Sequence, residues 1–192
     1  MKILIANDEA FNFTYRANID ALRELGEVRF FSPLHDSELP ACDLLYLPGG
    51  YPELFLEEIG AQAAMCQQIR AYAERGGRIY AECGGFMYLC RDIDGVPMAG
   101  VLPFSATMQG ARLHLGYRQM EGLRGHEFHY SDIRETEHPG IEAVRRQCSA
   151  KGVQVSTPIY IYGNVICGYT HWYWAEQGFE HLWNTIRSLA GR

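Results

Sequence analysis

The chain has 192 residues, of which 47% are apolar and 21% charged, the composition of an ordinary globular domain. Its formal net charge of -6 and the lack of any basic run argue against binding to nucleic acid or to an anionic membrane surface. Met1 is not followed by a basic segment and a long apolar core, and the apolar runs have only the length of strands. We therefore expect one domain, residues 1–192, in the cytoplasm, with no signal peptide and no membrane contact.

The first half of the chain alternates between strand and helix patterns. Apolar runs at 2–7, 28–33, 43–50 and 78–83 are typical of strands. Apolar residues at helical spacing occupy 14–25 and about 53–75, and each of these segments ends in glycine. This alternation predicts an α/β fold with a doubly wound, mostly parallel sheet.

After residue 95 the pattern changes to short alternating runs. Those at 111–120 and 125–133 predict an antiparallel extension or a covering hairpin. The stretches PIYIYG and NVICGYTHWYW predict a second hairpin, which turns at Gly163-Asn164. A closing helix is expected over about 176–189, because its apolar residues share one face.

The six cysteines form no CxxC pair, so the sequence does not indicate a zinc or thioredoxin-like site. Cys83, in YAECGGFMYL, stands out because it lies between a strand and a short helix. Carboxyl ends of parallel strands form the ligand-binding edge of an open α/β sheet, so Cys83 and the loop Pro48-Gly49-Gly50 are expected to meet there. Free N–H groups at the start of the helix favour a thiolate.

Glycines beside Cys83 suit the binding of an oxyanion. Gly84 permits a tight turn and offers the first backbone N–H, and Gly49-Gly50 can supply a second donor because no Cβ blocks close approach. CGG alone favours a buried structural thiol beside a flexible turn, whereas CGG together with the Gly49-Gly50 loop favours a site.

Four segments carry a specific resemblance: DEAFNF (8–13), LPGGYPE (47–53), AECGGFMYL (81–89) and GHEFHYS (125–131). In order, and over nearly the whole chain, they resemble the glutamine amidotransferase domain of the cobyrinic acid a,c-diamide synthase family of cobalamin biosynthesis. The resemblance implies the flavodoxin-like fold of class I amidotransferases, with Cys83 as the glutaminase nucleophile. It also places Gly49, Gly50 and Tyr51 in the loop that contacts the oxyanion and glutamine.

His171, in GYTHWYW, is the predicted base. It follows the apolar run at 165–167, which is expected beside the Cys83 strand, and the stretch resembles the family's late Tyr-x-His motif. Tyr173 departs from the family, where this position often carries a second histidine, and from many class I amidotransferases, where it carries Glu or Asp. We therefore expect a Cys-His dyad and interpret Glu176 as a solvated acid at the start of a helix.

The segment HEFH offers two histidines, but strand alternation sends His126 and His129 to opposite faces, so no metal site is predicted. The same alternation puts Glu127 and His129 on one face. The resemblance favours a place for both in the pocket, where they contact glutamine or orient a catalytic group. From the residues alone, ordinary salt-bridge or surface roles are equally compatible.

The resemblance implies that Cys83 attacks the glutamine amide, that His171 protonates the departing ammonia, and that water hydrolyses the glutamyl thioester. The ammonia then serves an ATP-dependent synthetase that amidates the a- and c-carboxylates of cobyrinate. The chain has no GxxxxGK[ST] phosphate loop. We therefore expect the synthetase domain or subunit, with its ATP and Mg²⁺, outside this chain, and no cofactor within it.

Three other interpretations stay open. The missing acid at Tyr173 favours a binding or regulatory domain that keeps the amidotransferase fold without turnover. A glutaminase that serves another carboxylate acceptor has the same sequence features. A different hydrolase with a cysteine on a strand-to-helix turn is the third.

Overall fold

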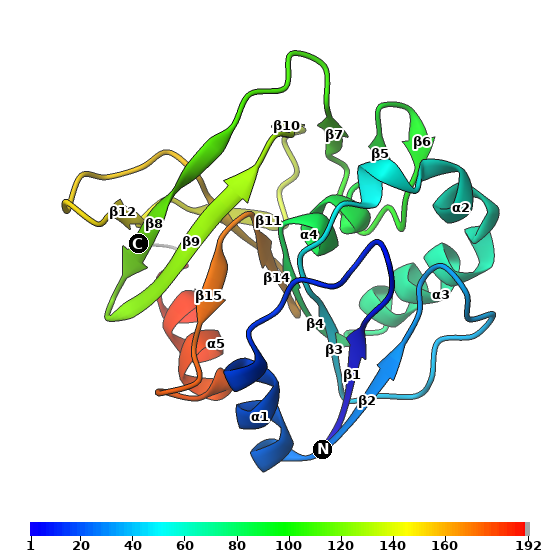
Figure 1. The fold of residues 1–192 in the computed structure, drawn as a ribbon, viewed down its shortest axis with the longest axis horizontal. Coiled ribbons are helices and arrows are strands. Elements are labelled where there is room, and N and C mark those ends of the chain that lie inside the picture. Colours follow the sequence, from blue (N-terminus) through cyan, green and yellow to red (C-terminus); the bar gives the residue numbers. More distant parts are fainter. Residues whose placement is uncertain (191–192) are drawn as a thin grey trace.

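The computed structural model describes residues 1–190, which form a central sheet covered by helices on both faces (Figure 1). In spatial order its seven strands are β11 (Ile141–Val144), β13 (Ile159–Tyr162), β14 (Val165–Gly168), β4 (Arg78–Glu82), β3 (Leu44–Leu47), β1 (Lys2–Ala6) and β2 (Glu27–Phe31). The strands from β14 to β2 are parallel, and β13 pairs in antiparallel fashion with both of its neighbours, β14 and β11. The order β2-β1-β3-β4-β14 is that of flavodoxin-like sheets, so the predicted fold is confirmed.

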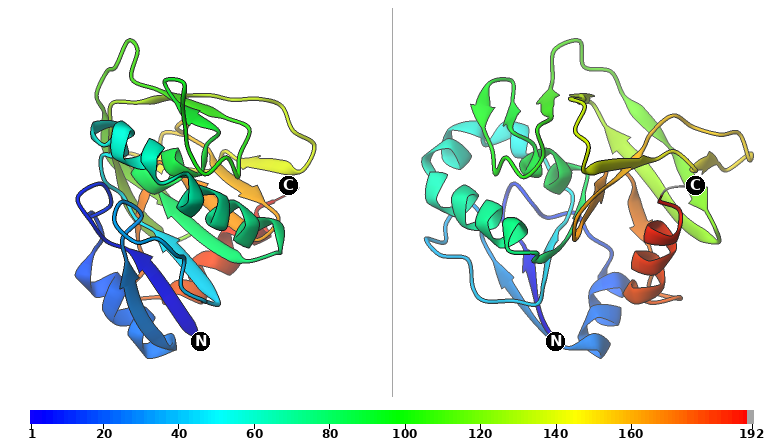
Figure 2. Two further views of the ribbon diagram at one scale, coloured as in Figure 1. Left: turned by 90° about the vertical axis from the view of Figure 1, so that its right-hand side faces the viewer. Right: turned by 180° about the vertical axis from the view of Figure 1, so that it is seen from behind.

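Alternate side chains of the central strands build one core on each face of the sheet. Leu4 and Leu45 belong to the core under the helices α3 and α4, and Ile3 and Leu44 belong to the core under α1 and α5. Figure 2 shows the sheet between these two helical layers. Because both faces are buried, the strands are apolar at almost every position.

The helices are α1 (Arg16–Leu25), α2 (Leu56–Ala61), α3 (Ala63–Glu74), α4 (Gly84–Leu89) and α5 (Phe179–Ser188), with a 3-10 turn, η1, at Pro52–Leu54. Within residues 1–190, no helix has the length and apolar character needed to cross a bilayer. The helix predicted over about 53–75 is interrupted. Gln62 leaves the helical path between α2 and α3, and its side-chain amide donates a 2.7 Å hydrogen bond to the Leu34 carbonyl oxygen.

The antiparallel extension predicted after residue 95 forms two smaller sheets. One has the strand order β12 (Cys148–Ser149), β8 (His114–Met120), β9 (Leu123–His129) and β15 (His171–Tyr173). The other has the order β10 (Asp132–Arg134), β7 (Ser105–Thr107), β5 (Asp92–Ile93) and β6 (Val96–Pro97). The β8–β9 hairpin and β15 lie beside the central sheet in Figure 1.

The run NVICGYTHWYW crosses between two sheets. β14 lies beside β4 as expected, but it ends at Gly168, and His171 begins the separate strand β15, which pairs with β9. Thr170, in the crossing, is buried and donates a 2.6 Å hydrogen bond to the Gln147 side-chain oxygen. This crossing carries His171 to the end of β4.

Helix α4 packs against the end of β3 with almost no space between the main chains. The Gly85 N–H donates to the Pro48 carbonyl oxygen at 3.0 Å, and a Cβ at Gly85 would lie 2.1 Å from the Leu47 carbonyl oxygen. Only glycine fits at this contact.

We predict that Gly85→Ala lowers the free energy of unfolding by about 2 kcal/mol, because the added methyl group forces α4 away from β3. Gly60→Ala in α2 is the control, since its Cβ would meet no atom closer than Val96 Cγ1 at 3.7 Å and alanine favours helix. Urea denaturation monitored by circular dichroism measures both. Equal midpoints for Gly85→Ala and the wild-type chain would contradict the close packing.

Candidate active site

Cys83 occupies a strained turn between β4 and α4. Its φ of 47° and ψ of -107° lie in a region that residues other than glycine rarely adopt. Two hydrogen bonds hold this conformation: the Cys83 N–H donates to the Gly168 carbonyl oxygen at 2.8 Å, and the Met87 N–H donates to the Cys83 carbonyl oxygen at 3.0 Å. The thiol is thereby fixed at the carboxyl end of β4.

A pocket of about 300 Å³ opens at this thiol. Its lining comes from five parts of the chain: Asn12, Phe13, Gly50, Tyr51, Cys83, His126, Phe128 and His171. Cys83 itself is only 5% exposed, whereas Tyr51 is 42% exposed. The volume lies at the small end of ligand pockets and suits a ligand of amino-acid size.

The loop after β3 places free backbone donors beside the thiol. The Gly49 N–H donates to the Phe13 carbonyl oxygen at 3.1 Å, so it is not available to an oxyanion. The N–H groups of Gly50 and Gly84 have no hydrogen-bond acceptor among residues 1–190. Of the predicted donors, these two remain free to bind a negative oxygen.

Gly49 instead leaves space for the ring of His171, the predicted base. A Cβ at this position would lie 2.2 Å from Cε1 of His171. The His171 ring also contacts Phe13, with 4.6 Å between ring centroids, and stacks on His126 at 5.0 Å. The structure therefore brings Cys83, the glycine loop and His171 together.

His171 is 3% exposed and lies close to two acidic groups. Burial alone would lower the pKa of His171, but contacts with Cys83 and Glu82 and their negative charges outweigh burial and raise it to about 10. The imidazole is therefore protonated at neutral pH. A charged imidazole beside sulfur stabilises negative charge that develops there.

Glu127 and His129 share one face of β9, as predicted, but that face points away from the pocket. Glu127 pairs with Arg118, and both side chains are largely buried. The His129 ring stacks on Tyr169 with 3.6 Å between centroids, and burial lowers the His129 pKa to about 4. The structure thus corrects the placement of these two residues, because strand alternation groups residues on a face without identifying which face lines the pocket.

The alternate residues of β9, His126 and Phe128, line the pocket instead. The Tyr15 hydroxyl and His126 Nδ1 are 2.7 Å apart. Burial raises the pKa of Tyr15 to about 12, and burial together with the nearby charge of His171 lowers the pKa of His126. The Tyr15 hydroxyl therefore donates this hydrogen bond to Nδ1 of a neutral His126.

Glu82, which was not predicted as a site residue, is 2% exposed and has Oε2 at 3.7 Å from Nδ1 of His171. A signal was present, since carboxylates are rare in strands buried on both faces unless they have partners. Tyr173 and Glu176, the two positions that the sequence offered as partners of His171, make other contacts. The Tyr173 ring packs against Tyr15 at 5.3 Å, and Glu176 forms an exposed ion pair with Arg124 at 3.1 Å.

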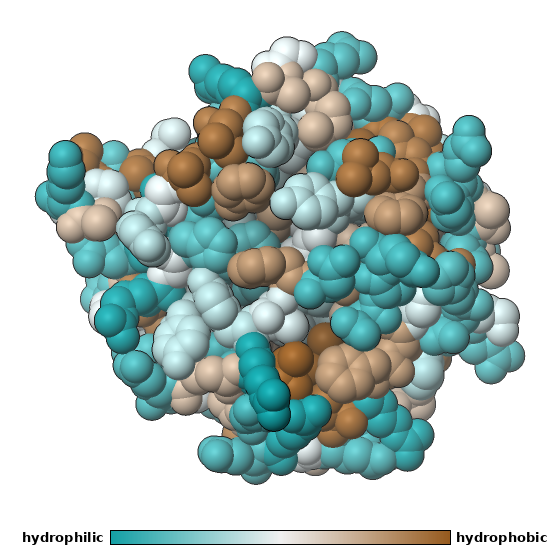
Figure 3. All heavy atoms as spheres, in the orientation of Figure 1, coloured by the Kyte–Doolittle hydropathy of each residue, from teal (hydrophilic) through white to brown (hydrophobic). Residues whose placement is uncertain are grey.

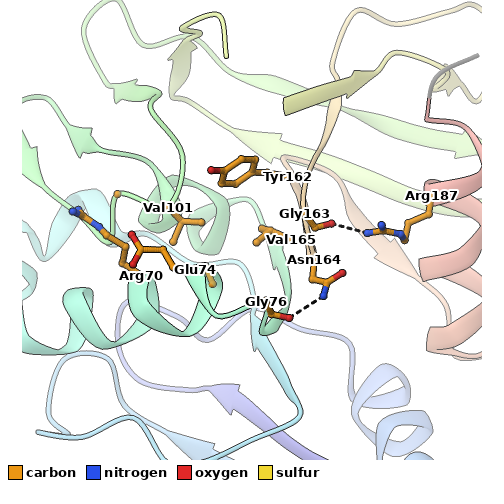
Figure 4. A pocket seen from close by; sticks show the side chains of 11 residues that line it. Arg70, Glu74, Gly76, Val101, Tyr162, Gly163, Asn164, Val165 and Arg187 are labelled. Atoms are coloured by element: carbon orange, nitrogen blue, oxygen red, sulfur yellow. Dashed lines mark hydrogen bonds between the residues drawn. The ribbon is translucent and has the colours of Figure 1, made fainter. Parts of the chain in front are cut away.

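A wider hollow of about 560 Å³ lies at the other end of β4 (Figure 4). Across it, Arg187 donates to the Gly163 carbonyl oxygen at 2.7 Å, and the Asn164 side chain donates to the Gly76 carbonyl oxygen at 2.8 Å. Its lining contains neither cysteine nor histidine. The pocket at Cys83 is therefore the candidate active site.

Comparison with known proteins gives the family. The model of the CobB/CobQ-like glutamine amidotransferase domain matches residues 2–179. The chain belongs to this family. The resemblance inferred from the four sequence segments is thereby confirmed.

Curated relatives of this amidotransferase domain include two diamide synthases. The chain is 40% identical to the hydrogenobyrinate a,c-diamide synthase of Pseudomonas aeruginosa over 183 residues, which cover 90% of the chain and 41% of the relative. It is 37% identical to the cobyrinate a,c-diamide synthase of Salmonella typhimurium over 196 residues, which cover 92% of the chain and 42% of the relative. The chain therefore spans about two fifths of the length of these relatives.

Solved structures support the amidotransferase fold. A crystal structure of a glutamine amidotransferase matches with a TM-score of 0.60 at 20% identity, over 99% of each chain. PurLQS from Thermotoga maritima matches with a TM-score of 0.59 at 19% identity, over 88% of this chain and 86% of the other.

We predict that His171 stabilises the fold in a pH-dependent way. Because its pKa is raised from 6.5 to about 10, its contribution is complete below about pH 6.5 and is lost as the pH rises towards 10. The difference in free energy of unfolding between the wild-type chain and His171→Gln should shrink over this range in urea denaturation. The control His181→Gln alters an exposed histidine and should show no such trend, and a constant difference for His171→Gln would contradict a charged imidazole.

Proposed function

We propose that this chain hydrolyses glutamine through a thioester at Cys83 and supplies the ammonia to a synthetase that amidates the a- and c-carboxylates of cobyrinate or hydrogenobyrinate. One observation carries the hydrolysis: Cys83, Gly50 and His171 line a single pocket of amino-acid size, and the N–H groups of Gly50 and of Gly84, the residue after Cys83, have no acceptor among residues 1–190. The acceptor is proposed from the names of the diamide synthases that the chain resembles.

In the first half of the reaction, Cys83 Sγ attacks the side-chain carbonyl carbon of glutamine. The negative charge moves to the carbonyl oxygen, where the N–H groups of Gly50 and Gly84 stabilise it; loss of one such donor typically costs roughly a hundredfold or more in rate. His171 then gives its proton to the departing nitrogen. Ammonia leaves, and the glutamyl group stays on sulfur as a thioester.

In the second half, water attacks the thioester carbon and His171 accepts a proton from it. The same two N–H groups stabilise the oxygen, the C–S bond breaks, and glutamate leaves. The thiolate and the imidazolium are then restored. No metal ion or cofactor enters either half-reaction in this scheme.

We place the ATP- and Mg²⁺-dependent step in a synthetase domain or subunit outside this chain. Exposed apolar side chains suit contact with such a partner: Tyr51 and Leu54 follow the glycine loop, and Leu113 and Leu115 lie at the start of β8. Figure 3 shows apolar atoms gathered over the start of β8. Contact there would allow ammonia to pass between the two sites without release into water.

A regulatory domain without turnover is the second candidate function. In the sequence, this interpretation is favoured by position 173, which carries Tyr where an acidic residue often follows the catalytic histidine. Glu82 lies 3.7 Å from His171 and supplies an acid from another strand, which favours turnover.

We predict that a diazo-ketone analogue of glutamine alkylates Cys83, because the thiol lines a pocket of amino-acid size. Peptide mass mapping should find the adduct in the wild-type chain and in Cys42→Ser, and none in Cys83→Ser. Cys42 is partly exposed and lies outside the pocket lining, so its replacement is a matched control. An unmodified Cys83 in the presence of a synthetase partner would exclude the glutaminase proposal.

We also predict that the chain alone forms no diamide from cobyrinate, ATP and glutamine. Mass spectrometry of the corrinoid should show amidation only after a synthetase partner is added. Diamide formed by the isolated chain would contradict the division of labour proposed above.

A further inference from the structure

Glu82 is a carboxylate enclosed in the protein at the carboxyl end of β4. It is 2% exposed, and in the described part of the chain its one ion-pair partner is His171. A carboxylate in such a place is costly unless donors and a positive charge compensate for the loss of water. The groups around Glu82 should therefore include hydrogen-bond donors and a positive charge.

Three hydrogen bonds fix the carboxylate in one orientation. Tyr80 and the backbone N–H of Trp172 donate to Oε1 at 2.6 and 3.0 Å, and Tyr46 donates to Oε2 at 2.9 Å. Burial, and then the negative charge of Glu82, raise the pKa of both Tyr46 and Tyr80 well above the ordinary value. Both hydroxyls therefore stay protonated and act as donors, and Oε2 stays on the side of His171.

Glu82 also holds the backbone beside His171. β15 has β9 on one edge, and side chains take the place of a strand on the other. The Trp172 N–H binds Glu82, while the Trp172 carbonyl oxygen accepts a 2.8 Å hydrogen bond from the side chain of Asn18, which is fully buried. Glu82 thus helps to fix β15, the strand that carries His171.

The ring of His171 is turned so that Nδ1 faces Glu82. Nδ1 is buried and has no hydrogen-bond partner within residues 1–190, and its separation of 3.7 Å from Oε2 is that of an ion pair. This orientation leaves Nε2 as the ring nitrogen for the thiol and for the departing ammonia. Tyr173 cannot take the part of Glu82, because its ring packs against Tyr15.

We infer that Glu82 is the positioning residue of the site: it fixes the orientation of His171 and stabilises its positive charge, without touching the substrate. The acid beside His171 is thus Glu82, the residue directly before Cys83, and not a residue of β15 such as the one at position 173. The catalytic consequence rests on the proposed glutaminase activity, whereas the interaction of Glu82 with His171 does not.

Glu82→Gln tests the inference with little change in shape. The amide oxygen can still accept from Tyr80 and Trp172, and the Tyr46 hydroxyl can turn to accept from the new NH₂ group. Near His171, the other titratable groups are Cys83 in the turn after β4, His126 on β9 and Tyr15 before α1; Tyr15 and His126 are uncharged at neutral pH. Loss of the Glu82 charge is therefore expected to change the titration of His171 directly.

The first measurement is an NMR titration of the His171 imidazole, which needs no enzymatic activity. We expect its pKa to fall by about one unit or more in Glu82→Gln, equal to a tenfold or larger loss of proton affinity. The control Glu180→Gln removes a carboxylate that pairs with Arg78 at the other end of β4, and should leave His171 unchanged. An unchanged His171 titration in Glu82→Gln would overturn the inference.

The second measurement is glutaminase kinetics with a synthetase partner present. We expect Glu82→Gln to lower kcat by roughly tenfold or more while KM for glutamine stays near its original value, because substrate binding is untouched. Equal kcat values for Glu82→Gln and wild type would overturn the positioning role. A wild-type protein with the expected titration and no glutaminase activity would overturn the proposed function and leave the Glu82–His171 interaction standing.

If Glu82→Gln fails to fold, Tyr46→Phe provides the test. It removes one donor from Oε2, so the carboxylate concentrates more negative charge towards His171. The His171 pKa is then expected to rise, opposite in sign to the effect of Glu82→Gln. A His171 titration unchanged by Tyr46→Phe would count against Glu82 as its partner.

Discussion

The hydrogen bond from the Cys83 N–H to the Gly168 carbonyl oxygen connects the two halves of the site. It ends the parallel pairing of β4 with β14 and holds Cys83 in its strained turn. Three residues beyond Gly168 the chain reaches His171 on another sheet. The position of the base relative to the nucleophile therefore follows from the register of one pair of parallel strands.

Close contact between main chains shapes the rest of the site. Gly85 meets the carbonyl group of Leu47, Gly49 leaves space for the imidazole, and Gly84 lies against Gly50. Side chains are excluded where these segments meet, so backbone N–H groups are the donors that can reach an oxyanion. The chemistry of the pocket is thus a consequence of how tightly the loop after β3 packs on α4.

The features that the sequence predicted are those with a local signature. Strands buried on both faces are apolar throughout, so the parallel sheet could be inferred, and glycines beside Cys83 indicated a turn with free donors. The face of β9 that lines the pocket could not be inferred, because polar residues occur on both of its sides and the pairing of His171 on β15 with His126 decides between them. Glu82 was missed since its partners, Tyr46, Trp172 and His171, come from distant parts of the chain.

Adjacent positions in the chain give Glu82 and Cys83 a separation fixed by covalent geometry. Only His171 has to be brought to them through tertiary structure, on a strand that belongs to the β12-β8-β9-β15 sheet. The central sheet therefore carries the acid and leads directly into the nucleophile, whereas the four-stranded sheet supplies the base. The same sheet also supplies His126 and Phe128 to the pocket, so the pairing of β15 with β9 sets the base and part of the pocket wall together.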